Sequence, residues 1–445
     1  MVNIRVDFNG SAGKMKPMHA VNNGPVGSKE RATGGTFTYF KEAGIPYARN
    51  HDASFSTYYG GEYSVDVHRI FRNFDADPTD PASYDFECTD ECVANTFSVE
   101  TEVYYRLGSR IEHGKKVGTF PPKDFQKWAV ICEHIIRHYN EGWANGFHYG
   151  ITYWEIWNEP DCRNPDGSNP CWQGNDEEFI EFFCTALKHL KECFPKLKIG
   201  GPAFCSLSMR RPEKEKLIRG LFTALSERKI PLDFFSFHYY TNDPAKMVEQ
   251  VKIGRALCDE YNYPNAELHL NEWNYLRGWL ADDWIYTLRS EKGLKGASFI
   301  TAVMSVCQDS PLDMLMYYDA RPCGMNGLFN TDFLTPLKGY YSIKMFGDLY
   351  RMGTFVRPEY TEDPIYCIAA KSEQGAGLMI TNYAEDDLSP AETVEIDLRG
   401  VEGRSATLYL LDETHDMEAV ETLTLGDKLT LTVPLFATVF LKIHL

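Results

Sequence analysis

Short runs of apolar, β-prone residues alternate with longer helical patterns along most of this chain. Strands that alternate with helices form parallel sheets, so we expect an α/β fold, a (β/α)8 TIM barrel. The alternative, a doubly wound open sheet, would place a glycine-rich phosphate turn after an early strand, and the sequence has neither a GxGxxG motif nor a P-loop. The eight strand-like runs are Pro17 to Asn22, Pro46 to Arg49, Thr101 to Leu107, Ile151 to Trp157, Leu197 to Gly201, Asp233 to Tyr239, Ala266 to Asn271 and Asp313 to Tyr318. The helical patterns between them are Lys29 to Ala43, Glu87 to Ser98, Pro122 to Asn140, Asp176 to Cys193, Glu213 to Arg228, Ala245 to Asn262 and Trp284 to Gln308.

The last hundred residues have a different pattern, in which strands follow one another with only turns between them. They are Tyr366 to Ala370, Gly377 to Asn382, Thr393 to Leu398, Ala406 to Leu411, Lys428 to Val433 and Ala437 to His444. This pattern predicts an antiparallel β-sandwich. The first strand, Asn3 to Phe8, alternates in the same way and can pair with the sandwich. We therefore expect a catalytic barrel over residues 12–348 and an accessory sandwich made of residues 1–11 and 349–445.

Polar side chains gather where the barrel strands end. In such barrels the functional groups lie at the carboxyl ends of the strands, so these segments converge on one face. They are Arg49 to Asp52, Asn158 and Glu159, His238 to Tyr240, Asn271 and Glu272, and Tyr317 to Asp319. The irregular loop from Pro160 to Asn175 follows directly after one of them and is expected to shape the entrance of the site.

Two of these strand ends carry a glutamate beside an asparagine. Glu159 closes the segment Trp154 to Pro160, and Glu272 lies in the segment Leu268 to Asn274. Cleavage of a glycoside needs one carboxylic acid to protonate the leaving oxygen and one carboxylate near the anomeric carbon. Because strands four and seven supply the two glutamates, both can face one cleft. The sequence therefore predicts glycoside hydrolysis.

The segments around both glutamates resemble glycoside hydrolases of clan A, and within it family 39, the β-xylosidase and α-L-iduronidase family. The resemblance rests on Trp154 to Pro160, on Phe235 to Tyr239, on Asn271 to Asn274 and on the small C-terminal sandwich. It implies that Glu159 is the general acid/base, that Glu272 is the nucleophile and that the anomeric configuration is retained. It also implies that Asn158 holds the sugar 2-hydroxyl.

Other substrate-binding candidates lie beside the two glutamates. The nucleophile must stay ionised, which requires a cation or hydrogen-bond donors. Arg49 is the candidate cation, unless it pairs with Asp52, and His238 and Tyr240 are candidate donors. The alternation of side chains along a strand does not decide whether Tyr239 or Tyr240 points inward, because strand ends bend. The remaining candidates are His51 and Asp319 as polar groups, and Trp273, Trp279, Trp172 and Tyr318 as surfaces on which a sugar can stack.

This chain departs from the family pattern at two positions. Asn271 precedes the nucleophile where threonine is common, and Asp52 follows His51 where a glycine is expected. Both positions adjoin the sugar that would be cleaved off, so they put the identity of that sugar in doubt.

The amino-acid composition disfavours several classes of binding partner. The chain has 45 basic and 63 acidic side chains, a net charge of -18, which disfavours nucleic acid and anionic membranes. No cofactor or metal is expected, since no HExxH motif occurs. The N-terminus carries no apolar signal segment, and twelve scattered cysteines fit a reducing compartment, so we expect a cytoplasmic location. A homo-oligomer is compatible with the sequence.

The most specific prediction is an intracellular retaining glycosidase that removes terminal β-xylosyl units from short oligosaccharides. An α-L-arabinofuranosidase or another neutral exo-glycosidase is the alternative within the same chemistry. A carbohydrate-binding barrel without turnover is the alternative outside it.

Overall fold

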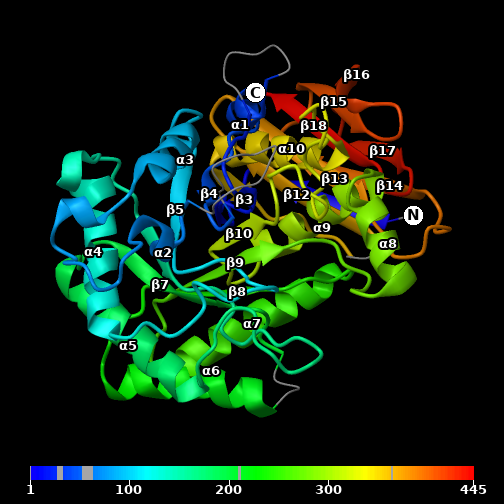
Figure 1. The fold of residues 1–445 in the computed structure, drawn as a ribbon. Coiled ribbons are helices and arrows are strands. Elements are labelled where there is room, and N and C mark those ends of the chain that lie inside the picture. Colours follow the sequence, from blue (N-terminus) through cyan, green and yellow to red (C-terminus); the bar gives the residue numbers. More distant parts are fainter. Residues whose placement is uncertain (1, 28–33, 53–63, 209–211, 362–363) are drawn as a thin grey trace.

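A closed barrel of eight parallel strands forms the larger part of the molecule (Figure 1). The computed structural model describes residues 2–27, 34–52, 64–208, 212–361 and 364–445. The strand order around the barrel is β10-β3-β4-β5-β6-β7-β8-β9, which confirms the predicted fold. The strands are β3 (Ala20–Asn22), β4 (Tyr47–Arg49), β5 (Glu102–Leu107), β6 (Tyr153–Ile156), β7 (Lys198–Phe204), β8 (Phe234–His238), β9 (Glu267–Trp273) and β10 (Met314–Tyr317).

Helices connect successive strands on the outside of the barrel. They are α1 (Phe37–Ala43), α2 (Val67–Ile70), α3 (Glu87–Phe97), α4 (Phe125–Glu141), α5 (Asp176–Cys193), α6 (Pro212–Glu227), α7 (Pro244–Glu260), α8 (Ala281–Ser290), α9 (Leu294–Gln308) and α10 (Lys338–Met352). The single helix expected from Trp284 to Gln308 is in fact two helices, because the extended backbone of Gly293 separates α8 from α9. Helix α10 was not predicted. The first residues of the helix expected from Lys29 lie outside the described residues.

The helix boundaries follow from local capping. The Asp124 carboxylate accepts a hydrogen bond from the backbone of Lys127 at the start of α4, and Gly142 ends this helix in a left-handed conformation with φ of 76°. At the start of α5, Asn175 and Glu178 form a reciprocal capping box. Short-range hydrogen bonds thus set both ends of α4 and the start of α5.

The C-terminal residues form two sheets that enclose a separate apolar core. The smaller sheet has the order β1-β14-β17 and the larger one β16-β15-β18-β13-β12-β11-β2. The N-terminal strand β1 lies parallel to β14, whereas the other neighbours described in these sheets are antiparallel. The strands are β1 (Val2–Asp7), β2 (Gly13–Lys14), β11 (Thr354–Val356), β12 (Ile365–Lys371), β13 (Gly375–Asn382), β14 (Glu392–Arg399), β15 (Ser405–Leu411), β16 (Asp416–Thr424), β17 (Lys428–Val433) and β18 (Thr438–His444). Strand β16 was missed because it is a largely exposed edge strand without an apolar face.

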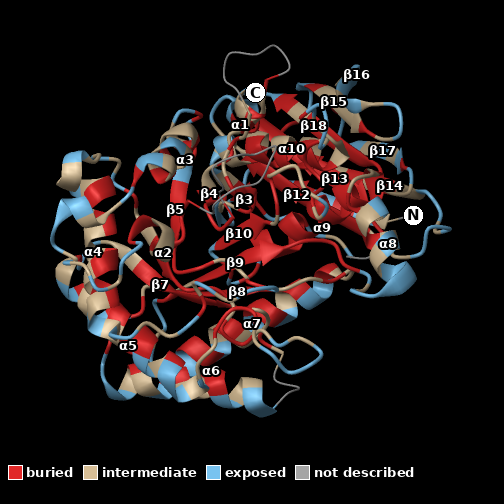
Figure 2. Cartoon of the chain, in the orientation of Figure 1, coloured by how far each residue is buried: buried red, intermediate tan, exposed pale blue. Residues whose placement is uncertain are grey.

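Helix α9 lies between the barrel and the sandwich. Every residue of α9 is buried, as the continuous red ribbon in Figure 2 shows. It contacts strands β12 and β13 of the sandwich and helices α7 and α10 of the barrel. Phe299 of α9 packs against Tyr383, with ring centroids 5.4 Å apart. The two parts therefore share an apolar interface.

Among the described residues, no helix combines the length and the apolar composition that a membrane span requires.

Candidate active site

The two glutamates meet at the carboxyl ends of the barrel strands, with a histidine beside both. Glu159 follows β6, the fourth barrel strand, and Glu272 lies near the end of β9, the seventh. His238 of β8 is the register partner of Glu272. Its Nδ1 atom lies 2.9 Å from Oε1 of Glu159 and 3.5 Å from Oε2 of Glu272. One oxygen of each glutamate and a ring nitrogen of His238 lie within 4.8 Å of one another, so the pair faces a common space.

Arg49 is the cation that holds this arrangement. Its side chain is fully buried at the end of β4. Nη1 lies 3.3 Å from Oε2 of Glu272, and Nη2 donates to Oδ1 of Asn158 at 2.6 Å. Nε donates to Oε2 of Glu155 at 2.7 Å, and the structure gives no ion pair between Arg49 and Asp52. One rigid guanidinium thus orients both Asn158 and Glu272.

The carboxylate of Glu155 holds the guanidinium of Arg49 in place. It is completely buried in β6, and its other oxygen accepts hydrogen bonds from Ser236 at 2.6 Å and from Asn271 at 2.5 Å. Sequence reasoning did not assign a role to Glu155, although a carboxylate inside an apolar strand is a signal that it is paired. Asn271, noted only as a departure from the family pattern, completes this support.

The pKa values of the two glutamates are raised to different extents. Burial raises the pKa of Glu159 to about 8, and the nearby Cys162 and Asp161 add to the effect. Burial raises the pKa of Glu272 to about 7, where His238, Arg49 and the Tyr240 hydroxyl limit the rise. Glu159 therefore keeps its proton to higher pH than Glu272, which is the order that a proton donor and a nucleophile require.

Tyr240, rather than Tyr239, reaches Glu272. Its hydroxyl donates to Oε1 of Glu272 at 2.6 Å. The ring of Trp279 meets that of Tyr240 edge-on at 5.3 Å and stacks on Trp284 at 5.6 Å. Since 55% of Trp279 is exposed, it presents an open aromatic surface beside the site, and its role in sugar stacking stays a prediction.

Two of the tryptophans proposed for stacking lie elsewhere. Trp273 is fully buried and packs against Tyr317 and Phe299, on the helix side of β9. The register of β9 shifts near its end, so Asn271 and Glu272 both reach polar groups inside the barrel while Trp273 packs outward. Trp172 is buried against Trp157 and Phe182. The stacking role expected for these two rings is therefore corrected.

His51, Tyr318 and Asp319 belong to a second polar group at neighbouring strand ends. The hydroxyl of Tyr318 donates to Oδ2 of Asp52 at 2.8 Å. Asp319 is buried and is held by Asn23 at 2.9 Å and by Arg321 at 2.9 Å. These contacts make Asp319 a support of the loop after β10. Arg321 was not identified from the sequence, because it lies in a loop without a periodic pattern.

His51 is buried within this group. Its Nδ1 atom accepts a hydrogen bond from Nε of Arg106 at 3.2 Å. Burial and the charges of Arg49 and Arg106 lower the pKa of His51 well below its usual value, so its ring is neutral. It lines the barrel interior between two buried arginines.

Two thiols lie close to Glu159. The side chains of Cys162 and Cys205 offer sulfur atoms within 4.8 Å of each other and of a Glu159 oxygen. Cys162 and the buried Cys171 come from the loop after Glu159, and Cys205 follows β7. Hydrogen bonds from Cys171 and Cys205 lower the pKa of the Cys162 thiol. This thiol group had not been recognised in the sequence.

A (β/α)8 barrel with glutamates at the ends of its fourth and seventh strands, oriented by a buried arginine, defines the class of barrels that carry a paired-carboxylate site. Over about half of its length the chain resembles glycosyl hydrolase family 39. The family model "Glycosyl hydrolases family 39" matches residues 47–267, which include β4 to the start of β9.

Two relatives by sequence carry the name β-xylosidase. The chain is 26% identical over 267 residues to one from Geobacillus stearothermophilus, a match that covers 53% of this chain and 47% of that protein. It is 24% identical over 325 residues to one from Caldicellulosiruptor saccharolyticus, which covers 66% of this chain and 61% of that protein. The matches therefore span about half to three fifths of the length of these relatives.

Solved structures share the whole architecture. A glucosidase from Croceicoccus marinus superposes with a TM-score of 0.80 at 20% identity, covering 100% of this chain and 99% of that one. A monomeric β-xylosidase from Caulobacter crescentus CB15 gives 0.70 at 14% identity, with coverage of 100% and 99%. A GH51 α-L-arabinofuranosidase from Thermotoga petrophila gives 0.69 at 14%, with full coverage of both chains. At these identities the likeness concerns the fold.

Proposed function

We propose that this protein is a retaining glycoside hydrolase that removes terminal sugars, above all β-xylosyl units, from short oligosaccharides. The observation that carries the proposal is the carboxylate pair, with oxygens within 4.8 Å and with proton affinities in the order that acid and nucleophile need. Oxygens this close leave little room for a water molecule between the carboxylates, which favours retention over inversion.

In the first step, Glu272 attacks the anomeric carbon while Glu159 gives its proton to the leaving oxygen. A covalent glycosyl-enzyme forms and the aglycone departs. In the second step, Glu159 takes a proton from water, which displaces Glu272 and restores the anomeric configuration. The amide of Asn158 has its oxygen bound to Arg49, which leaves Nδ2 to donate to the sugar 2-hydroxyl.

A panel of nitrophenyl glycosides tests the substrate. It compares β-xylosides, α-L-arabinofuranosides and glucosides, which correspond to the activities named for the similar proteins. We expect the β-xyloside to give the highest kcat/KM. A preference for the arabinofuranoside would support the alternative assignment, and no turnover of any member would leave only a carbohydrate-binding role.

Two variants test the roles of the glutamates. Glu159→Ala should still form the glycosyl-enzyme from a substrate with an activated leaving group, and azide should restore its turnover. Glu272→Gly should accumulate no such intermediate. Wild-type activity in both variants would refute the assignment.

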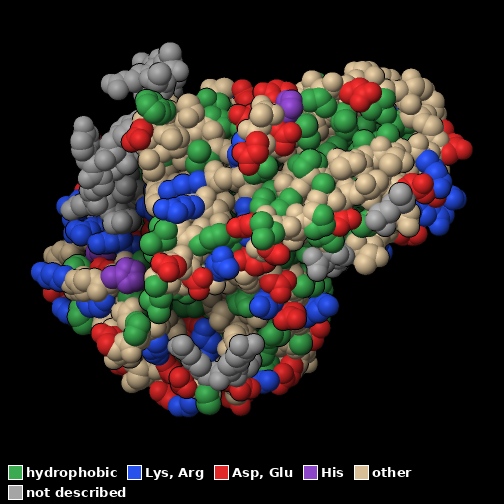
Figure 3. All heavy atoms as spheres, turned by 90° about the vertical axis from the view of Figure 1, so that its right-hand side faces the viewer, with side chains coloured by type: hydrophobic (Ala, Val, Ile, Leu, Met, Phe, Trp, Pro, Cys, Tyr) green, Lys and Arg blue, Asp and Glu red, His purple; other side chains and the backbone are tan. Residues whose placement is uncertain are grey.

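The net charge and the cysteines of the protein support proposals about its substrate and its location in the cell. The face in Figure 3 carries interspersed acidic and basic side chains, and the net charge of -18 favours neutral saccharides over anionic ones. Twelve free cysteines support the proposal that the enzyme acts in the cytoplasm, where thiols stay reduced. Detection of the protein and its activity in the cytosolic rather than the extracellular fraction of its source would test this.

A further inference from the structure

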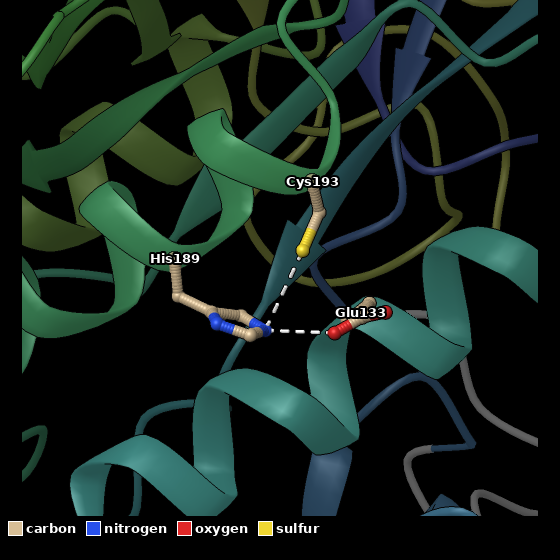
Figure 4. Close-up of side chains that lie close together, drawn as sticks. All are labelled: Glu133, His189 and Cys193. Carbon is tan, nitrogen blue, oxygen red and sulfur yellow. Dashed lines mark hydrogen bonds and ion pairs between the residues drawn. The ribbon is translucent and has the colours of Figure 1, made fainter.

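Three side chains with metal-binding atoms converge on the outside of the barrel, where α4 and α5 lie side by side. His189 and Cys193 lie one turn apart on α5, and Glu133 faces them from α4 (Figure 4). Nε2 of His189 lies 2.8 Å from Oε2 of Glu133 and 3.7 Å from Sγ of Cys193. One potential ligand atom from each residue lies within 4.8 Å of the other two. None of the three residues takes part in the carboxylate site.

This spacing fits a small tetrahedral cation. Zinc binds histidine nitrogen and carboxylate oxygen at about 2.0–2.2 Å and thiolate sulfur at about 2.3 Å, which places ligand atoms roughly 3.3–3.6 Å apart. The two measured separations bracket that range, so small side-chain rotations suffice. A histidine and a cysteine at positions i and i+4 of a helix project from the same face and can bind one ion together.

The surroundings support the ligands. Nδ1 of His189 lies 2.9 Å from Nε2 of the Gln126 amide. When Nε2 of His189 binds a cation, Nδ1 carries the proton, and the Gln126 amide must turn so that its oxygen accepts from Nδ1. Nε of Arg137 binds the other oxygen of Glu133 at 2.8 Å and leaves Oε2 for the ion. The carbonyl end of α5 lies at Cys193, where the helix dipole favours positive charge.

An ion can reach this position from solvent. His189 and Glu133 expose 17% and 14% of their side chains, and His189 lines a surface pocket of about 380 Å³ between α5 and the segment around Ile230. The pocket can supply water as a fourth ligand. A site with three protein ligands and one water is a known arrangement for zinc.

We propose that Glu133, His189 and Cys193 form a binding site for Zn²⁺ or a similar divalent cation, which links α4 to α5. On binding, the Cys193 thiol releases its proton, and the thiolate and carboxylate together balance the charge of the ion. The metal replaces the direct contact between His189 and Glu133. Its role is to stabilise the outer helical layer, separately from the glutamate pair.

Cobalt provides the first test, because a thiolate bound to Co²⁺ gives a near-ultraviolet charge-transfer band. Cys162 and Cys205 could also bind cobalt, so the titration uses chelator-treated protein carrying Cys162→Ser, without thiol reductants. We expect a band that saturates at one cobalt per chain. Adding Cys193→Ser should abolish the band, whereas adding Cys184→Ser, at another cysteine of α5, should leave it unchanged.

Zinc-dependent thermal stability is the second test and uses the otherwise unaltered chain. A hundredfold excess of Zn²⁺ over its Kd should raise the Tm by on the order of 3 °C. His189→Gln and Glu133→Gln each remove a direct ligand, so each should weaken zinc binding by at least the roughly 10- to 100-fold that loss of a residue supporting a ligand costs. The proposal is refuted if the cobalt band persists without Cys193, if Cys162→Ser protein shows no band, or if zinc raises the Tm of Cys193→Ser as much as that of the parent.

Discussion

Two neighbouring buried glutamates with raised pKa values are the central feature of this site at the residue scale. Burial raises both pKa values, to about 8 for Glu159 and about 7 for Glu272. The difference arises because Glu272 faces Arg49, His238 and the Tyr240 hydroxyl, whereas Cys162 and Asp161 lie near Glu159. The same pair can therefore hold one proton on the side where the leaving group needs it.

This difference predicts a narrow bell-shaped pH profile of kcat/KM. Activity should appear as the pH rises through the pKa of Glu272, because the nucleophile must be ionised, and should disappear as the pH rises through that of Glu159, which must be protonated. The maximum should lie between about 7 and about 8. In Glu159→Ala, measured with an activated leaving group, the alkaline limb should vanish; an unchanged alkaline limb would assign it to another group.

Replacement of Arg49 by lysine should distinguish the effect of its positive charge from the effect of its hydrogen-bonding geometry. Arg49→Lys keeps one positive charge but cannot bind Glu155, Asn158 and Glu272 at once. We expect kcat/KM to fall by about 100-fold, and the acidic limb of the pH profile to move to higher pH, because Glu272 loses its direct hydrogen bond from the Arg49 guanidinium. Arg219→Lys, in an exposed pair on α6, is the control and should change neither quantity. An unshifted acidic limb in Arg49→Lys would show that Arg49 does not act on Glu272.

The two tryptophans Trp279 and Trp273 should respond differently to substitution. Trp279→Ala removes an exposed ring beside Tyr240, so KM should rise by about tenfold with little change in kcat. Trp273→Phe alters a buried ring, so the protein should lose about 1–3 kcal/mol of stability while KM stays constant. Steady-state kinetics and urea unfolding measure both effects. A higher KM for Trp273→Phe alone would reverse the assignment.

At the scale of elements, capping residues determine where the helices between the barrel strands begin and end. The start of α5 shows this, since the Asn175 side chain accepts from the Glu178 backbone at 2.8 Å and the Glu178 carboxylate accepts from the Asn175 backbone at 2.8 Å. The loop that follows Glu159 ends at this cap. The capping box thus fixes one end of the loop beside the site.

Loss of this cap should lower stability without altering catalysis. Asn175→Ala removes an acceptor for a backbone N–H group, so the free energy of unfolding should fall by about 1 kcal/mol, as measured by urea denaturation. Asn175→Asp keeps an acceptor and adds negative charge at a helix N-terminus, so it should keep wild-type stability. Equal stability of the alanine variant and the wild type would mean that the cap does not hold α5.

Across the whole molecule, the interface between barrel and sandwich depends on α9. Nζ of Lys295 donates to Oδ1 of Asp387 at 2.9 Å and to the backbone oxygen of Glu385 at 2.6 Å, although its side chain is only 6% exposed. Charged hydrogen bonds from Lys295 therefore join the barrel to the sandwich beside their apolar interface.

Removal of that lysine should loosen the whole molecule. Lys295→Met leaves the two acidic residues of the sandwich without their cation, so scanning calorimetry should show a lower Tm, with a loss of about 1.5–3 kcal/mol. Activity at 25 °C should not change. Lys338→Met, which breaks a more exposed contact to Asp416, should cost less. A larger effect at Lys338 would place the main inter-domain contact outside α9.

Prediction from sequence worked where the structural signal is local. The eight strand runs, the two glutamates and the change to a sandwich are each visible within a few residues, because strand and helix periods repeat locally. Helix α10, edge strand β16 and the break at Gly293 were missed, since their sequences give weak or mixed periodic signals. The direction of Trp273 could not be read from its position beside Glu272, because the register of β9 shifts there and the regular alternation of side-chain faces is interrupted.

The sequence by itself determined the barrel, its strand order along the chain, and which strand ends carry glutamates, because each depends on short runs of residues. Only the tertiary structure decided that Arg49 pairs with Glu155 and Glu272, positions 106 and 223 residues away. It also brought Glu133 to His189 and Cys193. Such partners depend on barrel closure and helix packing, which set distances between residues that no local pattern connects.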